Sequence, residues 1–307
     1  MIACSVARRC ATLLRRFRSR SIILMYHRVA RIGFDPWSLC VTPEHFAEHL
    51  EVLRRFHRVR LDRMLPGSFP GKGVSVAITF DDGYADNLYE AKRLLARFDT
   101  PATFFITTGA IGGDREFWWD ELERLIYHPS APAAFFESPD ESREQAHLRW
   151  YTFLQPLAHE ARRQQLDRLF EHSGQTSEAR TTHRILTADE LRRLAADDLV
   201  EIGAHTVTHP LLAAQPVESQ FEELQQSKQW LEENLNRPIT SFSYPYGGRQ
   251  HYSGDTVEAV RRSGFVRAFT TEPHPPTRRA SRFEWGRINV TDLDGDQFHE
   301  LLTAAIV

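Results

Sequence analysis

The stretch Val74–Gly83, VSVAITFDDG, decides the fold class and raises the first question about function. An apolar, β-branched run ends at Phe80 in two adjacent aspartates, Asp81 and Asp82, followed by Gly83. Such a run predicts a strand, and its lack of polar alternation predicts burial on both faces, as in a parallel sheet. Two neighbouring charges at the end of a buried strand call for a reason.

Further short apolar runs alternate with helical patterns along the chain. We expect strands at 22–26, 59–61, 74–80, 102–107, 200–204, 241–244, 266–271 and 287–290. About eight strand–helix units in fewer than 300 residues favour an α/β fold of the (β/α) barrel type. An open doubly wound sheet is the alternative, although no G-x-G-x-x-G follows an early strand, which weakens its dinucleotide-binding version.

One region, at about 114–187, breaks this alternation. It shows helical patterns and turn formers but no convincing strand, so we expect a helical insertion in the barrel. The insertion opens with FWWDELERL, in which Trp118 and Trp119 are adjacent. Adjacent tryptophans usually pack in a core, whereas a sugar-stacking platform near the mouth of the site is the functional alternative for Trp118.

Composition and the N-terminus limit the cellular context. The chain has 307 residues, a net charge of −3 and three cysteines without a C-x-x-C pair, which gives no indication of a nucleic-acid partner and fits a reducing compartment. Residues 1–20 carry six arginines and no apolar stretch long enough for a secretory signal. We expect a basic tail on a cytoplasmic protein, either solvated or in peripheral contact with an anionic membrane surface.

Polar residues gather where the predicted strands end, which is where a (β/α) barrel places its chemistry. His27 follows the first strand, and His205 and His209 follow the strand at 200–204. Two histidines and one carboxylate leave coordination positions open, as a catalytic zinc site requires. The same set also forms the facial triad of non-haem iron(II) oxygenases, which is the second hypothesis.

The paired aspartates suggest a division of labour. On an ideal strand their side chains point to opposite faces, so both reach one mouth only if the chain turns there, which Gly83 permits. One carboxylate can then bind a metal while the other acts as a base on water. An N-cap for the following helix explains one aspartate but not two together with an H-x-x-x-H.

In this order the motifs TFDDG, HTVTHP and YPYG resemble the polysaccharide deacetylases with a NodB-like domain, carbohydrate esterase family 4. The resemblance covers about residues 21–307 and implies one catalytic domain with a distorted (β/α)7-type barrel. It also implies metal-dependent removal of N- or O-acetyl groups from an amino sugar, a polysaccharide or a lipid-linked glycan. The residue roles that it implies are Asp81 as base, Asp82, His205 and His209 as metal ligands, Pro245 and Gly247 in the acetate pocket, and the Tyr246 N–H as oxyanion donor.

Two departures from the family pattern leave roles to be assigned. Many members carry an arginine just before the proline motif, where this chain reads Phe242, Ser243 and Tyr244, so we expect Arg287 to supply the charge beside Asp81. The late histidine that often serves as general acid is also missing, since His299 is expected on a helix surface. His27 is then the candidate for acid or substrate contact.

The metal and the activity also leave alternatives. A site of two histidines and one aspartate accepts zinc, our first expectation, but also cobalt, nickel or iron. A catalytically inactive carbohydrate-binding module is the third hypothesis, although such a module would usually have lost Asp81 or a ligand. Two further motifs, LMYHRV at 24–29 and GRINV at 286–290, also resemble a branch of the family that acts in polysaccharide export and biosynthesis.

Overall fold

A single parallel sheet organises the molecule. In this computed structural model, which describes residues 21–64, 73–273 and 281–306, eight strands belong to it and all pair in parallel. Across the sheet they follow the order β10 (Ile288–Asn289), β1 (Ser21–Tyr26), β5 (Ser75–Phe80), β6 (Ala102–Ile106), β7 (Val200–Ala204), β8 (Ser241–Ser243) and β9 (Arg267–Phe269), while β4 (His57–Arg58) pairs with the start of β5.

The sheet curls toward a closed barrel. The bridge between Phe269 and Trp285 joins β9 to the segment that enters β10, so the two ends of the strand order come together. The expected α/β class and distorted (β/α)7-type barrel are therefore confirmed. The strand expected at 59–61 was misplaced: β4 ends at Arg58, and after the Val59 N–H bonds to Val76 the chain enters a 3-10 turn at Leu61–Arg63.

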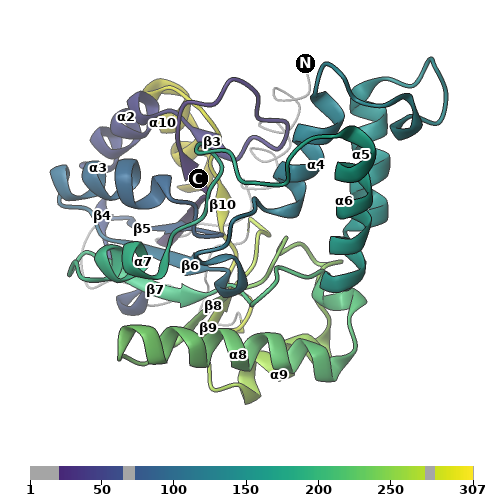
Figure 1. Ribbon diagram of the computed structural model, residues 1–307. Helices are drawn as coiled ribbons and strands as arrows, with labels where there is room; N and C mark the ends of the chain where they lie inside the picture. The colour runs from purple at the N-terminus through teal and green to yellow at the C-terminus, as the bar shows by residue number, and fades with distance from the viewer. Residues whose placement is uncertain (1–20, 65–72, 274–280, 307) are drawn as a thin grey trace.

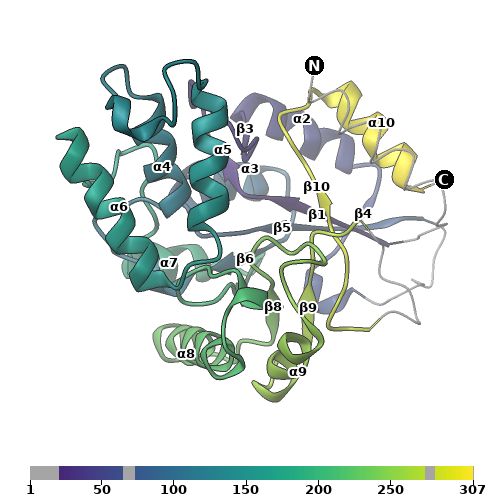
Figure 2. The ribbon, with the colours of Figure 1, turned by 90° about the vertical axis from the view of Figure 1, so that its right-hand side faces the viewer.

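Helices cover the outside of the sheet. They are α2 (Pro43–Leu53), α3 (Lys92–Arg97), α7 (Ala188–Ala195), α8 (Val217–Leu235), α9 (Gly254–Arg262) and α10 (Gly295–Ile306). Figure 1 and Figure 2 show α8 and α9 side by side below β8 and β9, and α2 beside α10. None of the helices formed by the described residues is long and apolar enough to cross a membrane.

Strand alternation builds two cores from one sheet. In β5, Val76, Ile78 and Phe80 point outward into the large core beneath the helices, whereas Ala77 points into the barrel with Phe105 and Phe269. Successive side chains of a strand alternate between faces. The next inward positions after Ala77 are Thr79 and Asp81, so the parity of β5 alone aims Asp81 at the barrel axis.

The helical insertion lies between β6 and α7. It contains α4 (Trp118–Tyr127), α5 (Arg143–Leu154) and α6 (His159–Ser173), which stand together to one side of the sheet in Figure 1 and Figure 2. Ser142 begins α5 with a capping box that uses Gln145. A separate apolar core joins these helices to the barrel loops and includes Tyr84 and, at its edge, Tyr246.

Two short strands, β2 (Arg28–Val29) and β3 (Cys40–Val41), pair with each other outside the main sheet. The sequence analysis did not predict them. Cys40 is buried and free. The basic tail predicted at 1–20 lies outside the described residues.

Candidate active site

Asp81 sits at the centre of an interior hydrogen-bond network. It follows the last residue of β5, is 2% exposed, and its N–H bonds to the Tyr26 carbonyl at 3.0 Å. Both of its carboxylate oxygens lie 2.7 Å from guanidinium nitrogens of Arg287. This is the bidentate geometry in which arginine binds a carboxylate most strongly. The charge expected beside Asp81 therefore does come from Arg287.

Arg287 is itself fully paired. Its side chain also donates to the Thr79 hydroxyl at 3.2 Å, the Thr270 carbonyl at 3.2 Å and the Ser243 hydroxyl at 2.7 Å. Burial alone would raise the pKa of Asp81, but the charge and hydrogen bonds of Arg287 act together with the nearby His205 and His27 and lower that pKa to about 2. Asp81 is therefore held as a carboxylate at neutral pH.

Ser243 explains how an arginine from another strand fits here. It points inward from β8, and its hydroxyl lies 3.2 Å from Asp81. A small side chain at this position leaves room for the Arg287 guanidinium. The sequence showed that the usual arginine was missing at 242–244, but not that a serine would complete the replacement.

Asp82 leaves strand geometry at once. Its φ is 76°, in the left-handed region that non-glycine residues rarely adopt, and that of Gly83 is 96°. The expected turn is present, but it begins at Asp82 itself rather than at Gly83. The Thr107 N–H bonds to the Asp82 carbonyl at 3.1 Å and holds the turn against the end of β6.

His205 and His209 face the carboxylate of Asp82. Their Nε2 atoms lie 3.5 and 3.6 Å from its Oδ1. The Nδ1–H of His205 donates to the Ser243 carbonyl at 2.8 Å, which leaves Nε2 for a ligand. The two backbone N–H groups at Val207 and Thr208 donate to Glu223, which fixes the loop that carries both histidines.

The two imidazoles sit in different electrostatic surroundings. Burial lowers the pKa of His209 well below its usual value, and the nearby His205 and Arg162 act in the same direction. Burial would also lower the pKa of His205, but the carboxylates of Asp81 and Asp82 reverse the shift. His209 is therefore neutral at neutral pH, which is the form that binds metals.

Asp82, His205 and His209 fit a divalent metal. One ligand atom from each lies within 4.8 Å of the others, and all three residues are buried. Three protein ligands of this kind leave positions open for water and substrate. The predicted ligand set is thus brought together, and it suits zinc as well as cobalt, nickel or iron.

Backbone strain concentrates around this triad. Among the described residues seven non-glycine positions have positive φ, and four of them lie here: Asp82, Thr206, His209 and Tyr246. Each such conformation is unfavourable and is retained where the surrounding structure enforces it. The Thr206 hydroxyl accepts a bond from the His209 N–H at 3.1 Å, which is part of that enforcement.

The loop Pro245–Gly247 approaches His209, as the motif order suggested. The Tyr246 ring centroid lies 4.7 Å from that of His209, and its φ is 59°. A Cβ on Gly247 would come within 2.7 Å of the Thr271 nitrogen, so the position requires glycine. No described residue accepts a backbone hydrogen bond from the Tyr246 N–H, which is compatible with the predicted oxyanion role.

The two tryptophans of the insertion occupy different positions. Trp119 packs on His209 at 4.7 Å between ring centroids, and its indole N–H donates to the Tyr84 hydroxyl at 2.9 Å. Trp118 is 7% exposed and lies between Tyr151 and the Arg162 guanidinium. The arrangement seen is packing, and the predicted stacking of a sugar on Trp118 would require one of these neighbours to move.

The two candidate acids also differ in position. His27 follows β1, is half-buried, and is close enough to Asp81 and His209 to influence the pKa of each. His299 is exposed on α10, as expected. The structure therefore keeps His27 as the candidate near the triad.

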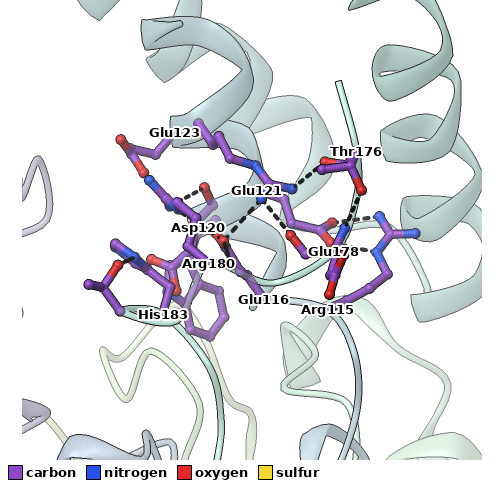
Figure 3. Close-up of polar contacts among 12 residues, drawn as sticks. Arg115, Glu116, Asp120, Glu121, Glu123, Thr176, Glu178, Arg180 and His183 are labelled. Atoms are coloured by element: carbon purple, nitrogen blue, oxygen red, sulfur yellow. Dashed lines mark hydrogen bonds and ion pairs between the residues drawn. The ribbon is translucent and has the colours of Figure 1, made fainter. Parts of the chain in front are cut away.

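A charged network fastens the insertion to the segment that returns to the barrel. Figure 3 shows Arg180 between Glu116 and Glu123, with distances of 2.8 and 2.7 Å, and Arg115 beside Glu121. Next to this network the Tyr84 hydroxyl donates to Asp120 at 2.7 Å. Burial raises the pKa of Asp120 to about 8, although the charge of Arg28 opposes the shift. Sequence patterns gave no signal for this network.

The barrel, the paired carboxylates and the buried Asp-His-His triad together define a candidate metal-dependent hydrolytic site. Comparison identifies the family: the polysaccharide deacetylase model matches residues 70–134 and 157–268, and the chain belongs to that family.

Individual relatives are distant. YxkH of Bacillus subtilis strain 168 is 21% identical over 282 residues, which cover 90% of this chain and 74% of YxkH. IcaB from Ammonifex degensii superposes with a TM-score of 0.62 at 19% identity, covering 94% of this chain and 98% of IcaB. The Streptococcus pyogenes deacetylase PplD, solved in complex with acetate, gives 0.59 at 19% identity, covering 91% and 96%. These structures share the fold of this chain.

Proposed function

We propose that the protein hydrolyses N-acetyl groups on an amino sugar of a cell-surface glycan intermediate, with zinc as the metal. The observation that carries the proposal is the ion-paired Asp81 immediately before a buried triad of Asp82, His205 and His209. A metal held by the triad supplies Lewis acidity, which acidifies water and polarises a carbonyl group.

The chain's own residues then have distinct tasks. Asp81 takes a proton from the attacking water, and Arg287 keeps that carboxylate ionised and correctly oriented. The Tyr246 N–H stabilises the negative charge that develops on the acetyl oxygen. Pro245 and Gly247 line the space for the acetyl group, and the acetate complex of PplD supports this reaction class. His27 returns a proton to the leaving amine.

Metal removal tests this proposal. Chelator treatment should abolish acetate release from an N-acetylated amino-sugar oligomer by at least ~100-fold, and added Zn²⁺ should restore it. Asp81→Asn is the matched control because it should retain metal, measured by elemental analysis, and remain inactive with zinc present. Acetate release that survives complete metal stripping would refute the mechanism.

A second measurement tests which glycan is the substrate in the cell. Mass spectrometry of glycan intermediates in a deletion strain should show a retained acetyl mass, and cell fractionation should recover the protein in the cytoplasm or on the membrane. An unchanged acetylation pattern would contradict the biosynthetic role while leaving the hydrolytic chemistry intact.

A further inference from the structure

Arg162 is a buried cation with no carboxylate partner among the residues that the structure describes. It projects from α6 of the insertion, is 2% exposed, and forms no ion pair with a carboxylate in the described part of the chain. Its Nη2 donates to the Thr208 carbonyl at 3.0 Å, and its Nη1 is buried with no hydrogen-bond partner. A buried guanidinium of this kind is destabilising unless its charge and donors are met.

The other fully buried arginines differ from it. Arg28 pairs with Asp86 at 3.0 Å, and Arg287 pairs with Asp81 through its two terminal nitrogens, Nη1 and Nη2. Glu223 is near enough to influence Arg162, but its oxygens accept bonds from Val207 and Thr208. Burial lowers the pKa of Arg162, so its surroundings do not compensate the charge.

The surroundings of Arg162 are aromatic. Its guanidinium carbon lies 5.1 Å from the centre of the Trp118 ring. The Trp118 ring lies 4.9 Å from Tyr151, which lies 4.3 Å from Trp37. The indole N–H of Trp37 is likewise buried and has no hydrogen-bond partner in the described ranges. Aromatic faces with unused N–H donors suit an oxygen-rich ring compound better than an apolar one.

This cluster adjoins the metal triad. Thr208, whose carbonyl accepts from Arg162, directly precedes His209, and the Tyr246 hydroxyl lies 3.5 Å from the His209 carbonyl. Asp82 is as buried as Arg162, at 2% exposure, and His209 is 5% exposed. A movement of the insertion away from the barrel loops that admitted substrate to the triad would also expose Arg162.

We infer that Arg162 binds an anionic group, a carboxylate or a phosphate, carried by the acetylated substrate next to the acetyl group that is removed. The inference rests on the proposed function and narrows its substrate to a charged sugar, such as a uronate-containing or phosphorylated one. The guanidinium provides the planar pair of donors that binds both oxyanions. The substrate supplies the charge that the folded chain lacks.

A structural role for Arg162 predicts a different outcome. If its only task is to hold the Thr208 carbonyl and hence His209, its loss should weaken catalysis on every substrate alike. It should also lower stability, because a packed hydrogen bond disappears. An anion site predicts selective loss, and replacing an uncompensated buried charge by Met should preserve or raise stability.

The experiment measures acetate release by the metal-loaded protein from three N-acetylated amino-sugar substrates that are neutral, carboxylated or phosphorylated. Wild type should prefer a charged member. Arg162→Met should lower kcat/KM on that member by roughly 10- to 100-fold more than on the neutral one, mainly through KM. Arg163→Gln, the exposed neighbour on the same helix with a side chain 44% exposed, is the control and should match wild type.

Arg162→Lys separates the two anions and covers the case in which the Met variant folds poorly. A lysine should rescue a phosphate better than a carboxylate, because it offers a point charge instead of a fork. Equal losses on all three substrates in the Met and Lys variants, or a wild type that prefers the neutral member, would overturn the inference.

A binding measurement keeps the inference separate from the proposed function. If none of the substrates releases acetate, the proposed function fails, and thermal unfolding with inorganic phosphate or acetate then decides the anion site. Either anion should raise the Tm of wild type and of Arg163→Gln above that in chloride, but not that of Arg162→Met. Identical shifts in all three proteins would refute anion binding at Arg162.

Discussion

Two buried arginines lie near the metal triad, one from the barrel and one from the insertion, and they are held differently. Arg287, from the barrel, donates to Asp81, Ser243, Thr79 and Thr270. Arg162, from the insertion, donates to one carbonyl and keeps an unused N–H. In the barrel, the charge of Arg287 is therefore neutralised by Asp81 without any ligand. In the insertion, the charge of Arg162 is left to be neutralised by a bound anion. We attribute the chemistry to the first region and recognition to the second.

The largest effect is expected from breaking the barrel side. Arg287→Met strands the buried Asp81 charge, so stability should fall by about 3–5 kcal/mol in urea unfolding. Turnover should fall by roughly 100-fold or more because the base loses its orientation, with metal content unchanged. The double variant Asp81→Asn/Arg287→Met should regain stability but not activity. Normal turnover in Arg287→Met would remove Arg287 from the mechanism.

An intermediate effect is expected at the loop between the two regions. In Gly247→Ala, alanine must adopt a φ of 62° and its Cβ lies 2.6 Å from the Thr271 side chain. We therefore expect the free energy of unfolding to fall by about 2–4 kcal/mol. Catalysis should also weaken, because the neighbouring Tyr246 is displaced. Gly112→Ala is the control, since Gly112 has a φ of 71° but open space around its Cβ. The free energy of unfolding of Gly112→Ala should fall by about 1 kcal/mol. Equal losses in both variants would mean that the contact with Thr271 is unimportant.

The smallest effect is expected on the insertion side, at Asp120. Its folded pKa of about 8 lies above the ordinary value of 3.8, so the folded state keeps a proton that the unfolded chain has released. Stability from this group is therefore lost as pH rises toward 8, by about 1 kcal/mol between pH 7 and pH 8.

Asp120→Asn should remove this pH dependence while still accepting the Tyr84 hydrogen bond. Urea unfolding at the two pH values checks it, with the exposed Asp140→Asn as control. Wild-type and Asp120→Asn proteins with the same pH response would show that Asp120 is ionised in the fold. The contrast with Asp81, which must stay ionised, would then disappear.

The same division explains what could be predicted from the sequence. The order of the motifs at predicted strand ends was sufficient to expect Asp81, Asp82, His205 and His209 close together, because the ends of parallel strands meet at one edge, and the family resemblance supplied their individual roles. The pairing of Asp81 with Arg287 was also predictable, since a buried carboxylate needs a charge and the usual arginine was absent.

The insertion could not be predicted in this way. Its contacts link residues such as Trp119 and His209, or Tyr84 and Asp120, through helix packing that has no fixed sequence spacing. Arg162 looks like any arginine on a helix, and only the fold reveals that it is buried. From the sequence it was also impossible to tell which of Trp118 and Trp119 lies against His209, because one helical step turns a side chain by about 100°.

The distance along the chain between Asp81 and Arg287, 206 residues, has a consequence for biosynthesis. At a ribosomal rate of 5–20 residues per second, the aspartate emerges roughly 10–40 s before its arginine. The three metal-binding residues are all made in the interval. The Asp-His-His triad is therefore complete in the nascent chain before the partner of Asp81 is made, and the buried ion pair can form only when the segment that enters β10 reaches its place beside β1.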